Sequence, residues 1–206
     1  MKPYLFFDFD ELKFNTTPAL VSYVNQRWKI DSIHSDYVNN NDNLDLIIKK
    51  YRTDIEINRG EIYEDIGKNF HSSILQQKDV QPMKDMCEIV TLLSKKYTLW
   101  TVTARQKAGM HVIQYLLDKH IPGCITGIHC VWEHMGNGNY KEISKKDFVE
   151  SVSGEKVAFI DDSPKEILKM QATIPSYLFD PDRLHEGLTQ VDNRVYGWKE
   201  IGERFL

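Results

Sequence analysis

Residues 5–15 of the chain read LFFDFDELKFN, an apolar start that leads into two acids. Tyr4 extends its apolar start, so residues 4–7 form an uninterrupted apolar run, which predicts a strand buried on both faces. The run ends at Asp8, and a second carboxylate, Asp10, follows two residues later. Such a pair is either the polar start of a loop or a set of oxygens that holds something positive.

Beyond residue 79, short apolar runs alternate with amphipathic helical patterns. The expected strands are residues 97–102, 125–132, 157–160 and 177–179, and the expected helices are residues 83–95, 106–119, 144–152 and 164–170. This alternation predicts an α/β fold, with a Rossmann-like parallel sheet, right-handed crossovers and helices on both faces. Asp8, Thr103 and the pair Asp161–Asp162 each follow a strand, so we expect them at the carboxyl edge of the sheet.

The segment between the first two strands is too long for a simple crossover. Asp8 and Thr103 lie 95 residues apart, whereas a strand-helix-strand unit needs about 30 residues. Thr17 and Pro18 mark a helix start, with a capping threonine hydroxyl followed by proline in the first turn. Residues 44–51 and 61–75 have helical patterns, the first after a polar break at residues 39–42. We therefore expect an α/β core formed by residues 1–12 and 79–206, with a small helical cap inserted at residues 13–78.

Composition excludes several classes of protein. The 206 residues carry a net charge of −4, which gives no electrostatic basis for binding nucleic acid. Three scattered cysteines indicate neither a disulfide framework nor a zinc site. The sequence shows no signal peptide and no apolar run of the length of a membrane span, so we expect a cytoplasmic protein.

The residues at the predicted sheet edge indicate phosphoryl chemistry. Three carboxylates repel one another unless a cation neutralises them, and an all-oxygen set of ligands suits Mg2+. A carboxylate beside such a cation can attack phosphorus and form an aspartyl-phosphate. Thr103 and Lys145 could then hold the other phosphoryl oxygens, Lys145 from the first turn of a helix that begins with a capping box, Ser144 to Asp147.

Four segments, FFDFDEL, LWTVTAR, SKKD and VAFIDDSP, resemble the four motifs of the haloacid dehalogenase superfamily of phosphatases, in the order of that family. The resemblance spans residues 4 to about 180. It implies that Asp8 is the nucleophile, that Asp10 is the general acid and base, and that Thr103 and a lysine bind phosphate. Lys145 is preferred to Lys146 as this lysine, because it directly follows Ser144.

The same resemblance implies the remaining site residues. Asp8, the carbonyl of Asp10 and Asp162 would bind Mg2+, and Asp161 would act through water or orient its neighbours. The candidate substrate contacts are Phe9, Ala104, Arg105 and Lys146. Arg105 is a candidate by its chemistry and not by the resemblance: it could bind a substrate carboxylate or phosphate, or be a solvated residue at the start of a helix.

Two positions depart from the pattern of the family. Leu12 stands where threonine or valine is usual, and Glu11 stands where glycine is common. A helical cap favours a small phosphorylated metabolite or nucleotide as substrate, whereas Glu11 and the DDSP segment are similar to protein phosphatases, so a phosphoprotein substrate stays open. Leu12 also motivates a third possibility, a catalytically weak interaction protein. A phosphorylation-sensing receiver module has little support, because its acid pair would come first in the chain.

Overall fold

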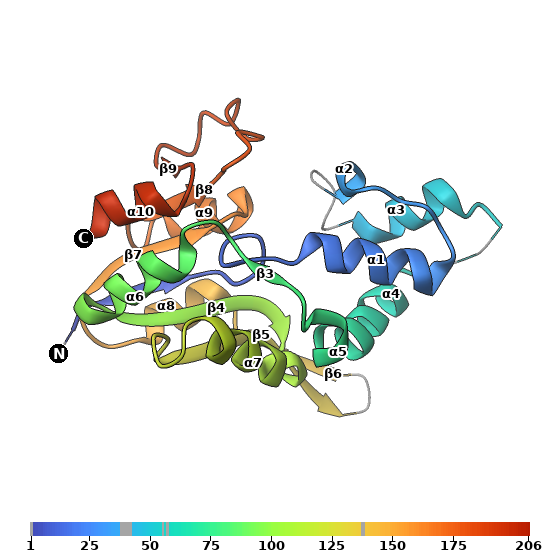
Figure 1. Ribbon diagram of the computed structural model, residues 1–206, viewed down its shortest axis with the longest axis horizontal. Coiled ribbons are helices and arrows are strands. Elements are labelled where there is room, and N and C mark those ends of the chain that lie inside the picture. Colours follow the sequence, from blue (N-terminus) through green and yellow to red (C-terminus); the bar gives the residue numbers. More distant parts are fainter. Residues whose placement is uncertain (1, 38–42, 55, 57, 137–138) are drawn as a thin grey trace.

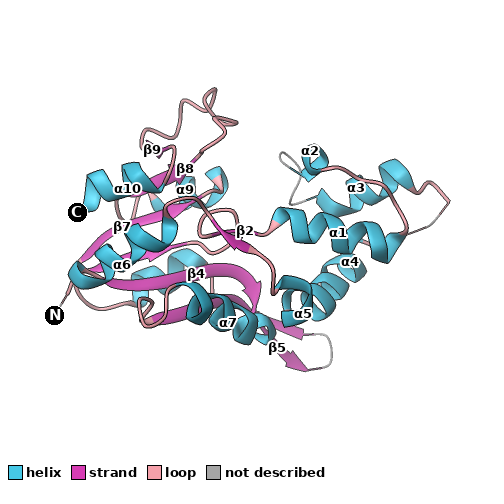
Figure 2. Ribbon diagram, in the orientation of Figure 1, coloured by secondary structure: helices cyan, strands magenta, loops and turns pink. Residues whose placement is uncertain are grey.

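The computed structural model describes residues 2–37, 43–54, 56, 58–136 and 139–206. Its main sheet has seven strands in the order β6-β5-β4-β1-β7-β8-β9 (Figure 1 and Figure 2). These strands are β1 (Tyr4–Phe7), β4 (Thr98–Gln106), β5 (Gly127–Gly136), β6 (Asn139–Glu142), β7 (Lys156–Asp161), β8 (Ser176–Phe179) and β9 (Arg194–Val195). Every neighbouring pair is parallel except β5 and β6. The predicted Rossmann-like α/β fold is therefore confirmed, with β6 as an antiparallel addition.

The central strand β1 is buried on both faces. Leu5 and Phe7 pack into one hydrophobic cluster, while Phe6 points into another on the opposite face. Residues of α6 (Met86–Lys96), α7 (Met110–His120) and α10 (Trp198–Phe205) cover the first face. Residues of α8 (Lys145–Ser151) and α9 (Pro164–Met170) cover the second. Strand β1 is thus held between two layers of helices, and this fixes the position of the residue that follows it.

The inserted segment forms a separate group of helices on the side of the sheet where β1 ends (Figure 1). Its elements are α1 (Thr17–Trp28), α2 (His34–Tyr37), α3 (Leu44–Tyr51), α4 (Arg59–Asp65), the π-helix η2 (Ile66–His71) and α5 (Ile74–Gln77). All of these except α5 contribute to a hydrophobic cluster of their own, which includes Tyr23, Ile48 and Phe70. Two short antiparallel strands, β2 (Phe14–Asn15) and β3 (Gln81–Pro82), connect the group to the core. No helix of the described residues is long and apolar enough to cross a bilayer.

Several elements differ from those expected. The helix predicted over residues 61–75 is divided, because the chain widens into η2 and Ser73 then caps a new helix, α5. Strand β4 continues past Val102 to Gln106, so Thr103 lies inside the strand. The loop or hairpin expected at residues 135–140 is the β5–β6 hairpin. Its residues 137–138 and the polar break at residues 39–42 lie outside the described residues.

The start of α1 corrects a detail of the sequence analysis. The helix begins at Thr17, but the capping group is not a threonine hydroxyl. Instead, one carboxylate oxygen of Glu11 accepts hydrogen bonds from the backbone N–H of Thr16 at 2.8 Å and of Thr17 at 2.7 Å. A carboxylate is favourable here because the start of a helix carries a partial positive charge.

Candidate active site

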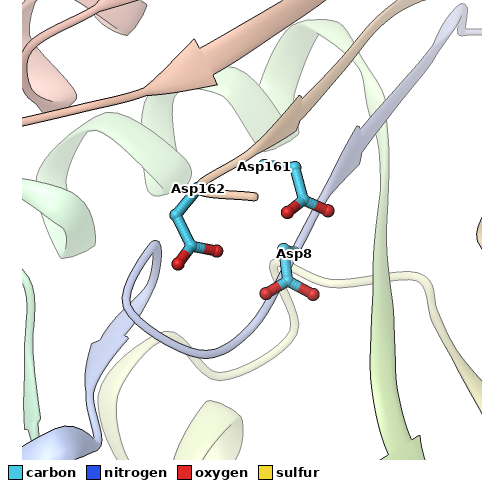
Figure 3. Close-up of side chains that lie close together, drawn as sticks. All are labelled: Asp8, Asp161 and Asp162. Atoms are coloured by element: carbon cyan, nitrogen blue, oxygen red, sulfur yellow. The ribbon is translucent and has the colours of Figure 1, made fainter. Parts of the chain in front are cut away.

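Three carboxylates meet beyond the ends of β1 and β7. Asp8 directly follows β1, Asp161 is the last residue of β7, and Asp162 comes next. Each offers an oxygen, and these oxygens all lie within 4.8 Å of one another (Figure 3). The two strands are parallel neighbours. Acids far apart in the sequence therefore meet at the carboxyl edge of the sheet, where they were predicted to lie.

Lys145 provides the positive charge for two of these acids. Its Nζ donates to Asp8 Oδ1 at 2.6 Å and to Asp161 Oδ2 at 2.7 Å. The residue is 4% exposed. Ser144 caps α8 by accepting a hydrogen bond from the backbone N–H of Asp147, so the capping box that the sequence indicated places Lys145 in the first turn.

Burial and crowding set the protonation of this cluster. Burial raises the pKa of Asp161 to about 7, although the Lys145 ammonium offsets part of the rise. Burial also raises the pKa of Asp8 and of Asp162, and neighbouring carboxylates raise both further. Burial would lower the pKa of Lys145, but Asp161 and Asp8 hold it above its ordinary value. The cluster thus favours binding of either protons or a cation.

The remaining candidates do not all face this cluster. Thr103 is buried on β4, and its hydroxyl accepts a hydrogen bond from the backbone N–H of Arg105 at 3.2 Å. Ala104 is exposed on the same strand. Lys146 lies on the outer side of α8, where its Nζ is 3.8 Å from a carboxylate oxygen of Glu150. The structure therefore brings Lys145, and not Lys146, into the acid cluster.

Arg105 and Asp10 form a bidentate ion pair at the edge of the site. Arg105 Nε donates to Asp10 Oδ2 at 2.9 Å, and Nη2 donates to Oδ1 at 2.6 Å. Burial opposes the ionisation of Asp10, but the guanidinium outweighs it and lowers the pKa of Asp10 to about 2. Asp10 is therefore a carboxylate in this structure.

Solved structures of known proteins share this arrangement of strands and helices. No protein-family model matches the chain, and no curated protein sequence matches it. A protein named as a HAD-hydrolase, YfnB from Bacillus subtilis bound to magnesium, is 14% identical over 99% of this chain and 98% of its own, with a TM-score of 0.62. CbbY from Rhodobacter sphaeroides in complex with phosphate is 12% identical over 98% and 97%, with a TM-score of 0.63. A HAD phosphatase from Thermococcus onnurineus is 14% identical over 99% and 97%, with a TM-score of 0.54.

This chain has the haloacid dehalogenase (HAD) fold. The fold that the four motifs implied is thereby confirmed over nearly the whole chain.

The two departures from the HAD motif have local structural reasons. Glu11 adopts a left-handed conformation, with φ of 50°, which glycine adopts without strain. The hydrogen bonds that its carboxylate makes to the start of α1 offset this cost. Leu12 is fully buried in the core, and its carbonyl accepts a hydrogen bond from the indole N–H of Trp198 at 2.8 Å. Its apolar side chain gives no hydrogen bond to Asp10.

Two residues near the site of this HAD fold were missed by the sequence analysis. Lys13 is fully buried, and its Nζ donates to the carbonyl oxygens of Asp8 at 2.7 Å and Phe7 at 3.3 Å. The sequence feature that could have indicated the burial of Lys13 is its position between two apolar residues, Leu12 and Phe14. His71 reaches the site from η2, where burial and the charge of Arg105 lower its pKa to about 3. No local pattern predicts that placement.

Proposed function

We propose that the protein is a magnesium-dependent phosphatase that forms an aspartyl-phosphate on Asp8. The observation that carries this proposal is the position of Asp8 at the end of the central strand. There its carboxylate accepts a hydrogen bond from Lys145 and lies beside two further carboxylates. The HAD fold supports it, because the similar structures include a protein named as a HAD phosphatase and one in complex with phosphate.

The acid cluster fits a magnesium ion by its chemistry. All its donors are oxygens, and three acids converge with Lys145 as the ammonium among them. Asp8, Asp162 and the carbonyl of Asp10 would hold the ion. Asp161 already accepts hydrogen bonds from Lys145 and the backbone N–H of Ser163, so it would orient these neighbours. When bound, Mg2+ would neutralise negative charge between the carboxylates and the phosphoryl oxygens.

In the first step, a carboxylate oxygen of Asp8 would form a bond to phosphorus while the bond to the leaving oxygen breaks. Lys145 and the Thr103 hydroxyl would hold the other phosphoryl oxygens, where negative charge is spread in the transition state. The leaving oxygen would take a proton from Asp10. Because Asp10 is ionised beside Arg105 in this structure, it would first have to acquire that proton.

In the second step, water would add to phosphorus and the bond from Asp8 to phosphorus would break. Asp10 would take the proton that the water loses, which restores the free Asp8 carboxylate. The ionised state of Asp10 already suits it to this role as a base.

The helices of residues 13–78 support a small phosphorylated molecule as substrate. We propose that this segment is a cap, because its π-helix η2 approaches the core at Gly109, within the short helix η3 (Lys107–Gly109). A cap in this place would limit access of bulky substrates to Asp8 and exclude water. A metabolite or nucleotide phosphate is therefore preferred to a phosphoprotein.

Hydrolysis of p-nitrophenyl phosphate with Mg2+ tests the proposed function. We expect turnover that EDTA abolishes and added Mg2+ restores, and a loss of at least about 10³-fold in Asp8→Asn. Asp118→Asn is the matched control, because Asp118 is exposed on α7. Wild-type activity in Asp8→Asn would exclude Asp8 as the nucleophile, and absence of turnover over a broad panel of phosphoesters would contradict the phosphatase proposal.

A further inference from the structure

Arg105 is buried against the residues around Asp8. Its side chain is 1% exposed, whereas that of Asp10 is 29% exposed. The centre of its guanidinium lies 4.8 Å from the centroid of the Phe9 ring, which is the range of a cation–π contact. The guanidinium is therefore held on one side by an aromatic face and on another by the Asp10 carboxylate.

The pair fixes both the place and the rotation of the Asp10 carboxylate. Each of its oxygens accepts from a different guanidinium nitrogen, at 2.6 Å and 2.9 Å. Two parallel charge-assisted hydrogen bonds define the plane of a carboxylate, which one lysine cannot do. The Thr16 hydroxyl donates instead to Glu11 Oε1, at 2.9 Å. Leu12 adds no hydrogen bond from its side chain, since that side chain is apolar and packed in the core.

We propose that Arg105 is a positioning residue that aims the Asp10 carboxylate at the reacting phosphoryl group, and is not a substrate ligand. The proposal rests on the proposed phosphatase function and adds a residue to it. Arg105 stands two positions beyond Thr103 on β4, so one strand would place both a phosphoryl contact and the support of the acid and base.

The proposal predicts which substrates depend most on Arg105. An alkyl phosphate has a basic leaving oxygen that needs a proton as its bond to phosphorus breaks, whereas p-nitrophenolate leaves without one. Misplacement of Asp10 should therefore lower kcat/KM for an alkyl phosphate more than for p-nitrophenyl phosphate. A residue that bound the phosphoryl group itself would lower both by similar factors.

A double-mutant cycle with Arg105→Gln, Asp10→Asn and the double variant tests this coupling. With an alkyl phosphate, we expect Arg105→Gln alone to lose roughly 10²-fold in kcat/KM, the lower end of the range for general acid catalysis. In the Asp10→Asn background we expect less than about a twofold further loss, because a residue that acts only through Asp10 has nothing left to position. Arg105→Lys should fall between Arg105→Gln and the wild type.

Arg52 provides a matched control. It makes the same type of bidentate pair, with Nε to Asp54 Oδ1 at 2.7 Å and Nη2 to Asp54 Oδ2 at 2.9 Å. This pair lies in the helical insertion, and Asp54 is largely exposed. Arg52→Gln should leave kcat/KM within about twofold of wild type. Circular dichroism tests whether each variant is folded. If Arg105→Gln is not folded, Arg105→Lys takes its place in the cycle.

Two results would overturn the inference. One is an equal loss of kcat/KM on Arg105→Gln in the wild type and in the Asp10→Asn variant, which would show that Arg105 acts independently of Asp10. The other is an equal loss for alkyl and p-nitrophenyl phosphates. Both need an active wild-type enzyme, so an inactive wild type would count against the proposed function, whereas additive losses in an active enzyme would count against Arg105 alone.

Discussion

At the scale of single residues, two neighbours of the same type occupy different environments. Lys145 and Lys146 are adjacent lysines in the first turn of α8, yet Lys145 is buried between two acids and Lys146 is directed outward. The capping box allowed Lys145 to be preferred from the sequence. The partner of Arg105 could not be predicted in that way, because Asp10 is 95 residues away and the two meet only when β4 lies beside β1.

Lys145→Met should be far more damaging than Lys146→Met. Removing Lys145 leaves Asp8 and Asp161 without their shared partner, and breaking a buried ion pair costs about 3–5 kcal/mol. The surface pair of Lys146 contributes little, so Lys146→Met should change the free energy of unfolding by less than about 0.5 kcal/mol. Urea denaturation in EDTA measures both. Equal destabilisation would contradict the assignment of Lys145 to the site.

Two substitutions at Glu11 separate the cost of its left-handed backbone from the stabilisation that its carboxylate gives to the start of α1. Both Glu11→Gly and Glu11→Ala remove the carboxylate that caps α1, but only glycine adopts φ of 50° without strain. Glu11→Ala should therefore unfold at a lower urea concentration than Glu11→Gly. We expect its free energy of unfolding to be lower by roughly 1–2 kcal/mol. If alanine were as stable as glycine, the left-handed conformation of Glu11 would be excluded.

At the scale of elements, strongly patterned segments were predicted well and irregular ones were not. The bounds of β1, α3 and α9 are those expected, because a continuous apolar run marks β1, a preceding polar break marks α3 and a proline start marks α9. Strand β9 and helix α10 were missed. The strand has only two residues, and α10 is defined by its packing on α6, with Ile89 against Gly202. Helix η2 was expected as a regular helix, since its apolar spacing does not distinguish a π-helix.

Two glycines report on how η2 packs against the core. A Cβ at Gly109 would lie 2.8 Å from the backbone carbonyl oxygen of His71, whereas a Cβ at Gly67 would meet only the flexible end of Gln106. Gly109→Ala should therefore cost about 1–3 kcal/mol of unfolding free energy, and Gly67→Ala less than about 1 kcal/mol. Gly187→Ala is the control, because a Cβ there meets nothing within 4 Å. A Gly109→Ala variant as stable as this control would show that η2 does not rest on η3.

At the scale of the whole molecule, the raised pKa values of the acid cluster make the stability of the fold depend on pH. An acid whose pKa is raised by folding binds more protons in the folded chain than in the unfolded one. The free energy of unfolding then falls as pH rises between the two pKa values. For Asp161 this window runs from its ordinary 3.8 to about 7. The pKa of His71 is lowered to about 3, so below about pH 6.5 the unfolded chain binds a proton there that the folded chain does not. His71 therefore makes the free energy of unfolding fall as pH falls, which is the opposite of the effect of Asp161.

A comparison with and without Mg2+ separates these effects. His71 affects both conditions alike, whereas Mg2+ would compete with protons for the carboxylates of Asp8 and Asp162. The increase in Tm on adding Mg2+ in place of EDTA should therefore be larger at about pH 8, where fewer protons compete with the cation, than at about pH 5. Thermal unfolding at the two pH values measures it. An increase that is the same at both would mean that the cation binds elsewhere.

The most direct test of the account is to trap the phosphorylated residue. Asp10→Asn should slow hydrolysis of the aspartyl-phosphate, so the intermediate accumulates during incubation with p-nitrophenyl phosphate and Mg2+. Borohydride reduces an aspartyl-phosphate to homoserine, and peptide mass spectrometry locates the product. We expect homoserine at position 8 and at no other aspartate, and none in EDTA. Release of p-nitrophenol with an unmodified Asp8, or with homoserine at a different aspartate, would contradict it.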